Sequence, residues 1–142
     1  MSCIFCKIRD GEAPSYKVYE DEYTVAFLDV NPVTDGHLLL IPREHTQYIE
    51  ELSATAIDAL LKTMMKIVPL IQRAMDSTDS NIMINNGPNA GQLIPHVHIH
   101  IIPRPTRSGP HIFSSVARFK PKSEEYFREI AAKILDEIEA AR

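Results

Sequence analysis

Apolar and polar positions alternate strictly over residues 96–102, where three histidines are separated by branched apolar residues. Successive side chains of a β-strand point to opposite faces of its sheet, so the alternation predicts a strand with all three histidines on one face. Other polar residues would serve equally well on a solvated face. Three histidines there indicate metal binding, nucleophilic attack or proton transfer. The run is His96, Val97, His98, Ile99, His100, Ile101 and Ile102.

Four more strands are predicted from similar patterns of apolar residues. Residues 16–20 and 23–28 are rich in aromatic and β-branched residues and are separated by a short acidic turn, which indicates a hairpin. Residues 37–42 are apolar on both faces, as a central strand is, and residues 81–85 alternate before the histidine strand. We expect residues 81–85 and the histidine strand to run antiparallel.

Two helices complete the pattern. Apolar residues recur at helical spacing from Ser53 to about Met75, and from Ser123 to about Ala141. Each serine suits the start of a helix, because its hydroxyl oxygen accepts a hydrogen bond from a free N–H group of the first turn. The longer helix carries no titratable pair that suggests catalysis, so we expect the chemistry elsewhere.

The composition is typical of one soluble globular domain, with 142 residues, 44% hydrophobic and 24% charged. We expect residues 1–142 to form that single domain, with residues 105–142 as a C-terminal extension that ends in a helix. The net charge of −4 gives no bulk attraction to nucleic acid, and no apolar run reaches the length of a membrane span. The N-terminus lacks the layout of a signal peptide, so we expect a cytoplasmic protein with reduced cysteines.

Cys3 and Cys6 form a Cys-x-x-Cys pair that has three interpretations. A redox motif normally follows a strand, and no strand is predicted before the pair. A disulfide is disfavoured in a reducing compartment. Zinc requires four ligands, so two histidines would have to complete its site. The histidine-rich segments elsewhere favour this third interpretation.

Asp29 comes at the end of the second predicted strand and has two interpretations. Aspartate is common in turns at strand ends, where its side chain bonds to nearby backbone groups. Its carboxylate is also suited to accept hydrogen bonds from both hydroxyl groups of a ribose.

The turn before the histidine strand contains Gly87 and Gly91 between Asn85 and Gln92. It is either a plain hairpin loop or a loop whose backbone N–H groups approach phosphate oxygens, where larger side chains would block the contact. The three histidines beside it favour phosphate binding. Asn85 and Gln92 would then donate further hydrogen bonds to the phosphate.

The chain resembles the histidine triad (HIT) family of nucleotide-binding hydrolases and transferases. The hallmark of that family is His-φ-His-φ-His-φ-φ, with φ apolar, and residues 96–102 match every position. The Ala-Gly-Gln before the strand and the Ile-Ile-Pro-Arg at its end match as well, and the resemblance extends from about Cys3 to Arg104. Leu93 departs from it, because some members carry a hydroxyl residue there, so one phosphate or leaving-group contact is missing.

The resemblance implies an α+β fold, in which a five-stranded antiparallel sheet packs against one long helix, and commonly a homodimer. It also implies a structural zinc, because a zinc-bearing branch of the family carries an N-terminal cysteine pair. The other two ligands there are a histidine after the third strand and the first histidine of the triad. The expected zinc ligands here are Cys3, Cys6, His45 and His96.

The family also places a ribose-binding acid where this chain has Asp29, which favours the functional interpretation of that residue. Apolar residues around it would form the wall of a base pocket, although ordinary core packing explains each of them nearly as well. These residues are Phe5, Ile8, Phe27 and Val30.

With His96 bound to zinc, His98 becomes the expected nucleophile at the α-phosphorus of a nucleotide, through a nucleotidyl-histidine intermediate. His100 would contact phosphate or help a proton reach the leaving group, while Gln92 and Gly91 would stabilise charge on the phosphoryl oxygens. We therefore expect a hydrolase or transferase that acts on a purine nucleotide derivative of the AMP type, as a nucleoside phosphoramidase does.

Three alternatives remain open at this point. One is a dinucleoside polyphosphate hydrolase, against which the cysteine pair favours the phosphoramidase. Another is a nucleotide-binding module without catalytic activity. The third is an enzyme in which the whole histidine triad and a carboxylate hold a catalytic metal, which would leave Cys3 and Cys6 without partners.

Overall fold

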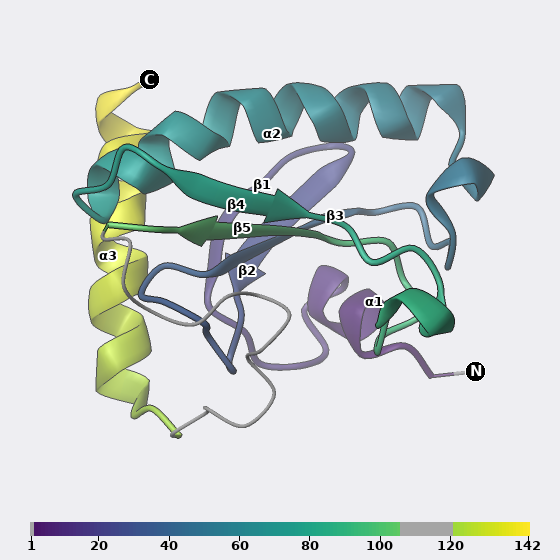
Figure 1. Ribbon diagram of the computed structural model, residues 1–142, viewed down its shortest axis with the longest axis horizontal. Helices are drawn as coiled ribbons and strands as arrows, with labels where there is room; N and C mark the ends of the chain where they lie inside the picture. Colours follow the sequence, from purple (N-terminus) through teal and green to yellow (C-terminus); the bar gives the residue numbers. More distant parts are fainter. Residues whose placement is uncertain (1, 106–120) are drawn as a thin grey trace.

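The centre of the molecule is a five-stranded sheet, seen in a computed structural model that describes residues 2–105 and 121–142 (Figure 1). Its strands lie in the order β1-β2-β3-β5-β4, and every neighbouring pair is antiparallel. The predicted fold class is therefore confirmed. The strands are β1 (Lys17–Glu20), β2 (Thr24–Leu28), β3 (Leu38–Pro42), β4 (Ser80–Met83) and β5 (Ile99–Pro103).

Three helices pack around the sheet: α1 (Ile4–Arg9), α2 (Ala54–Ala74) and α3 (Glu124–Ala140). The serines before α2 and α3 accept hydrogen bonds from the N–H groups of Ala56 and Tyr126, both at 3.1 Å, as predicted for helix caps. α1 was not predicted as a helix, because its six residues are too few to show a helical period. Two 3₁₀ turns, η1 (Ile49–Glu51) and η2 (Pro88–Ala90), lie in the loops.

The two faces of the sheet are covered by different helices (Figure 1). One face packs against α2 and α3 through a large core that includes Ala26 and Leu40, which lie opposite each other in the β2–β3 register. The other face packs against α1 through a smaller core that includes Phe27 and Leu39, the next pair in that register. The candidate chemistry lies on this second face.

The histidine strand starts later than predicted, at Ile99 instead of His96. The N–H group of His96 donates to the carbonyl oxygen of Ile94, and that of Val97 donates to Thr46, both at 2.8 Å, so this part stays outside the sheet ladder. The predicted alternation itself is confirmed. Val97 is buried in the large core, on the face covered by α2 and α3. His100 lies opposite Leu39, on the face covered by α1.

The C-terminal extension predicted for residues 105–142 is described only in part. Residues 106–120 lie outside the described residues, and α3 provides the predicted last helix. Within the described part of the chain, no helix combines the length and the apolar character that a membrane crossing requires.

Candidate functional site

Four side chains of metal-ligand type meet beside α1, and they are the four residues that the resemblance to the HIT family implied. Cys3 and Cys6 come from the start of α1, His45 follows β3, and His96 precedes β5. The Nδ1 atom of His96 lies 3.5 Å from Cys3 Sγ, 3.6 Å from Cys6 Sγ and 3.0 Å from His45 Nδ1. His45 Nδ1 lies 3.3 Å from Cys6 Sγ. His96 is fully buried, whereas His45 is exposed at the surface.

His96 presents an unprotonated nitrogen to this cluster. Its Nε2 lies 2.9 Å from the carbonyl oxygen of Pro42, which can only accept, so Nε2 carries the proton and Nδ1 does not. Two nitrogens and two sulfurs thus surround one point. Ligand atoms about 2.0–2.3 Å from a tetrahedral zinc lie about 3.3–3.8 Å from one another, close to the distances observed here. The donor set and its spacing therefore fit zinc.

Burial shifts the pKa values of two side chains in this cluster. Desolvation lowers the pKa of His96 to about 4, which keeps its imidazole neutral and able to bind a metal. Desolvation also raises the pKa of the Cys6 thiol, with the neighbouring Cys3 as a further cause. A bound cation reverses that shift, because it stabilises the thiolates.

A second cluster on the same face of the sheet contains Asp29, His37 and His100. Asp29 follows β2, His37 precedes β3, and His100 lies on β5. His37 Nε2 is 2.9 Å from His100 Nδ1 and 3.4 Å from Asp29 Oδ2, while the other oxygen of Asp29 accepts the N–H group of Asn31 at 2.8 Å. His37 is only 3% exposed, and it links the carboxyl group to the third histidine of the triad.

The proton positions in this second cluster follow from one backbone group. The N–H group of Val33 donates to His37 Nδ1 at 3.0 Å, so neutral His37 carries its proton on Nε2. That proton is directed at His100 Nδ1, so His100 carries its own proton on Nε2. A protonated ring nitrogen cannot bind a metal. These side chains are close enough to hold an ion, but their hydrogen bonds favour a chain of N–H donors.

His98 combines a fixed orientation with a free nitrogen. Its Nδ1 lies 2.8 Å from the carbonyl oxygen of His96, so Nδ1 carries the proton and Nε2 is unprotonated. The ring packs edge-on against Phe5 and His100, with centroids 5.1 and 5.0 Å away. Desolvation lowers the pKa of His98 and keeps it neutral near pH 7. A neutral imidazole held in this way is suited to act as a nucleophile.

Burial also sets the charges around Asp29. Desolvation lowers the pKa of His37 to about 3 and that of His100 to about 4, with neighbouring histidines as a further cause. Desolvation raises the pKa of Asp29 to about 6. The second cluster therefore contains neutral imidazoles beside a carboxyl group that titrates near pH 6.

The glycine-containing loop differs from the phosphate cradle predicted from the sequence. The N–H group of Gly87 donates to Gln92 Oε1 at 2.8 Å, and those of Gly91 and Gln92 donate to carbonyl oxygens within the loop. The Gln92 amide donates to the carbonyl oxygens of Gln47 and Ile94, and Asn85 Nδ2 donates to Gly91. These groups are therefore engaged in shaping the loop, and phosphate contacts through them require an exchange of hydrogen bonds.

Both glycines are needed for that shape. Gly87 has φ +100° and Gly91 has φ +92°, where other residues are strained. A Cβ atom on Gly87 would lie 2.8 Å from the ring of Tyr48, so the loop also has no room for a side chain at this position.

Three of the four residues predicted to wall a base pocket pack against one another. Phe5, Ile8 and Phe27 are 6%, 7% and 2% exposed, and the rings of the two phenylalanines lie 5.3 Å apart at an angle of 68°. Val30 is 58% exposed and lies at the surface. The structure thus places a buried apolar group beside His98 and leaves Val30 outside it.

The three histidines of the triad do not meet at one centre within the described residues. His96 belongs to the cysteine cluster, whereas His98 and His100 lie together beside His37. This arrangement argues against a catalytic metal bound by the whole triad. His37 is the residue that the predicted site lacked, and its signal was a histidine at the start of an otherwise apolar strand.

Comparison with known proteins identifies the family. A family profile described as the HIT domain matches residues 10–107, which is more than half of the chain. The chain belongs to the HIT family. Helix α3 of this HIT protein lies beyond the matched residues.

Several curated relatives carry names that state an activity. This HIT protein is 44% identical over 105 residues to the adenylylsulfatase HINT3 of Arabidopsis thaliana, which covers 74% of this chain and 53% of that protein. It therefore spans about half the length of that relative. It is 42% identical over 105 residues to the adenosine 5'-monophosphoramidase hnt1 of Schizosaccharomyces pombe, which covers 74% of this chain and 76% of that protein.

Solved structures of other HIT proteins share the fold of nearly the whole chain. A hypothetical histidine triad nucleotide-binding protein from Sulfolobus tokodaii is 36% identical with a TM-score of 0.86, over 97% of this chain and 93% of that one. A zinc-bound histidine triad family protein from Mycobacterium smegmatis is 31% identical with a TM-score of 0.77, over 100% and 99% of the two chains.

Proposed function

We propose that this HIT protein hydrolyses purine nucleotide derivatives at the α-phosphate, through a nucleotidyl group bound to His98. The observation that carries the proposal is the hydrogen bond from His98 Nδ1 to the carbonyl oxygen of His96, which leaves Nε2 free to attack. The preferred substrates are nucleoside phosphoramidates of the AMP type. The two relatives named as an adenosine 5'-monophosphoramidase and as an adenylylsulfatase support cleavage at this phosphorus.

The reaction proceeds in two steps. His98 Nε2 attacks the α-phosphorus, a nitrogen–phosphorus bond forms, and the bond to the substrate's amine breaks. The amine leaves with a proton supplied by solvent. Water then attacks the same phosphorus and the bond to His98 breaks. AMP is released with the oxygen and one proton of that water, and the other proton goes to solvent.

The second cluster binds and orients the nucleotide. The Asp29 carboxylate accepts the hydroxyl groups of the ribose, and the apolar group that contains Phe5, Ile8 and Phe27 contacts the base. His100 donates a hydrogen bond from Nε2 to a phosphate oxygen, since its Nδ1 is occupied by His37. Asn85, Gly91 and Gln92 hold the loop beside the phosphate and contact it after an exchange of their present bonds.

The cysteine cluster holds a structural zinc in this proposal. Cys3, Cys6, His45 and His96 supply four ligands, so the site is closed and has no open position for water. The zinc joins the N-terminal segment to the chain just before β5. The zinc-bound relative from Mycobacterium smegmatis supports this assignment. Thiolate ligands also suit the reducing cytoplasm, which is our proposed location.

Release of AMP from three substrates tests the proposed reaction. Wild type and His98→Ala are compared on adenosine 5'-phosphoramidate, adenylyl sulfate and diadenosine tetraphosphate. We expect turnover of the phosphoramidate, and a loss of at least about 10³-fold in the variant, because no neighbouring group replaces the nucleophile. Faster turnover of diadenosine tetraphosphate would favour the polyphosphate hydrolase. AMP binding without turnover of any substrate would favour a binding module.

We also propose that two copies of the chain pair through β4. Among the described residues, 2–105 and 121–142, this strand forms one edge of the sheet, so its outer N–H and C=O groups can pair with another strand, and Ile82 on it is 47% exposed. Gln72 of α2 accepts the hydroxyl group of Ser80 at 2.7 Å, which places one flank of α2 beside β4. Leu61 and Met65 lie on that flank at helical spacing and are 42% and 71% exposed.

Such a surface complements itself under two-fold symmetry, because an edge strand can pair with its own copy. The mass of the protein in solution tests the proposal. We expect a dimer for wild type and a monomer for Ile82→Lys, with Lys62→Glu on the solvent side of α2 as a matched control that stays dimeric. A monomeric wild type at micromolar concentration excludes the dimer.

A further inference from the structure

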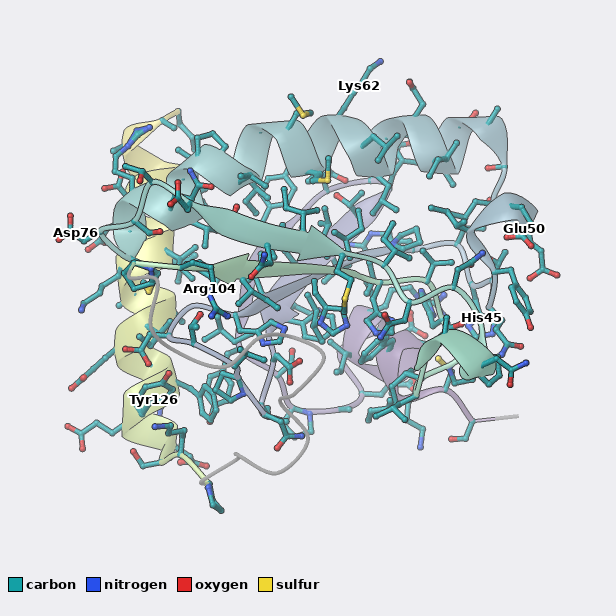
Figure 2. The ribbon with its side chains drawn as sticks, in the orientation of Figure 1. His45, Glu50, Lys62, Asp76, Arg104 and Tyr126 are labelled. Carbon is teal, nitrogen blue, oxygen red and sulfur yellow. The ribbon has the colours of Figure 1, made fainter. Side chains whose placement is uncertain are left out.

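Helix α3 lies outside the residues that the HIT domain profile matches, yet it is bonded to the loop that carries Asp29 and His37. The hydroxyl group of Tyr126 on α3 donates to Asp35 Oδ1 at 2.5 Å. Asp35 lies two residues before His37 in the segment 29–37, which we call the ribose loop. Figure 2 shows Tyr126 on the opposite side of the molecule from His45 and its metal-type cluster.

The ribose loop is held at both ends by its own hydrogen bonds. The N–H group of Asp29 donates to the carbonyl oxygen of His37 at 3.0 Å, and the N–H group of Val33 donates to the ring of His37. The loop therefore moves Asp29 and His37 together. Any contact that displaces its tip changes both the carboxyl group and the histidine that supports His100.

The tip of the loop is fixed by elements that are distant in sequence. Thr34 donates its hydroxyl group to the carbonyl oxygen of Pro103 at the end of β5, at 2.7 Å. Gly36 has φ +86°, and a Cβ atom there would lie 2.5 Å from the Met75 side chain at the end of α2. Tyr126 supplies the third contact. It is the only one of these three that comes from outside the profile-matched residues.

The position of Tyr126 is itself well defined. The neighbouring Phe127 stacks on Tyr16 with ring centroids 5.0 Å apart. The backbone carbonyl oxygen of Tyr16 accepts the N–H group of Leu28, the residue before Asp29, at 3.1 Å. Helix α3 is thus docked beside the first residue of the ribose loop as well as beside its tip. Lys122 lies 5.0 Å from the centre of the Tyr126 ring and covers it.

We infer that Tyr126 is a positioning residue for nucleotide binding, which holds the ribose loop through Asp35 so that Asp29 meets the ribose. The inference rests on the proposed ribose contact of Asp29. It assigns part of the nucleotide specificity to α3, a helix that contributes no residue to the reacting centre. Loss of the bond allows the loop more conformations, so ribose binding has to restrict them and becomes weaker.

The test compares the binding of AMP with that of 2',3'-dideoxy-AMP by calorimetry. Neither ligand is turned over, and they differ only in the two hydroxyl groups that Asp29 would accept. Wild type is expected to bind AMP more tightly. Tyr126→Phe should weaken AMP binding about fivefold and dideoxy-AMP binding by less than about twofold, because the ribose contact is lost in addition to any change that reaches the phosphate through His37 and His100.

Further variants separate this role from a general effect on folding. Asp35→Asn keeps an oxygen that accepts the Tyr126 hydroxyl group, so its AMP affinity should stay within about twofold of wild type. Asp35→Ala should match Tyr126→Phe, and the double variant should be no weaker than either single one. Tyr23→Phe is the matched control, because Tyr23 is exposed at the far end of β2 from Asp29.

The possible results distinguish two failures. Equal affinity of wild type for both ligands, or no AMP binding at all, contradicts the ribose contact in the proposed function and the inference with it. If wild type binds AMP more tightly than dideoxy-AMP and Tyr126→Phe binds AMP as tightly as wild type does, the inference alone is overturned. An equal loss of affinity for both ligands in Tyr126→Phe also overturns it, because the effect is then not transmitted through the ribose.

Discussion

The two histidine clusters use the same side chain in opposite ways. In the cysteine cluster, the Nδ1 atoms of His45 and His96 lie 3.0 Å apart, next to two sulfurs. In the second cluster, His37 and His100 are almost equally close, at 2.9 Å, but a proton lies between them. The first arrangement places four donor atoms of metal-ligand type around a point that a cation can occupy. In the second arrangement, hydrogen bonds already pair the facing ring nitrogens of His37 and His100.

Backbone groups cause this difference. The carbonyl oxygen of Pro42 holds the proton of His96 on the nitrogen that faces away from the cysteines. The N–H group of Val33 has the reverse effect on His37, because it forces the proton onto the nitrogen that faces His100. The distance between two imidazoles therefore does not distinguish a metal site from a proton relay. Their outer hydrogen bonds do.

The largest expected effect follows removal of a proposed metal ligand. Cys3→Ser should lose most of its zinc and about 4 kcal/mol of stability, which is what a ligand contributes at roughly 1,000 times its Kd. For a chain of this length we expect the melting temperature to fall by about 10 °C. Metal analysis and thermal unfolding measure both quantities. His100→Ala is the control and should keep its zinc, so full zinc content in Cys3→Ser would contradict the assignment.

Disruption of the second cluster should affect turnover and leave the metal in place. His37→Leu removes the donor to His100 Nδ1, so we expect kcat to fall about 10²-fold. His37→Gln keeps an N–H donor and should recover part of the loss. Steady-state kinetics on adenosine 5'-phosphoramidate provide the measurement. Zinc loss in His37→Leu would show that the two clusters are not separate.

The smallest effect is a pH dependence that originates from Asp29. Its pKa is raised to about 6, so the carboxylate that we propose to bind ribose forms as the pH rises through that value. AMP affinity should increase about tenfold between pH 5 and pH 7, in proportion to the ionised fraction. The folded protein holds this proton where the unfolded chain releases it, so stability should decrease from about pH 4 to pH 6. Titration calorimetry and melting curves test both trends, and Asp29→Asn should abolish them.

The sequence predicted those parts of the fold and site that local patterns encode. The alternation around Val97 and Ile99 correctly predicted which residues of the histidine strand are buried in the large core. The start of the predicted strand lies outside the sheet, because the N–H group of Val97 donates to the carbonyl oxygen of Thr46 and not to a neighbouring strand. The meeting of His96 with Cys3 was available only through family resemblance, since the two residues are 93 positions apart.

The remaining parts depend on contacts between segments that no local pattern reports. His37 reaches His100 across 63 positions, and its proton is placed by a backbone group of the loop. The hydrogen bonds that close the loop around Gln92 also follow from its folded shape, not from its glycines alone. Composition indicated a phosphate cradle there, and the structure shows a turn whose donors are already engaged.

The separation between Cys3 and His96 also has a consequence for synthesis of the chain. At about 5–20 residues per second, the ribosome adds His96 roughly 5–20 seconds after Cys3. Of the four proposed metal ligands, the two cysteines are thus synthesised first and His96 last. Closure of so large a loop comes late in folding, because the chain entropy has to be lost before the contact forms. The nascent N-terminus is therefore a free dithiol for several seconds before the histidine strand exists.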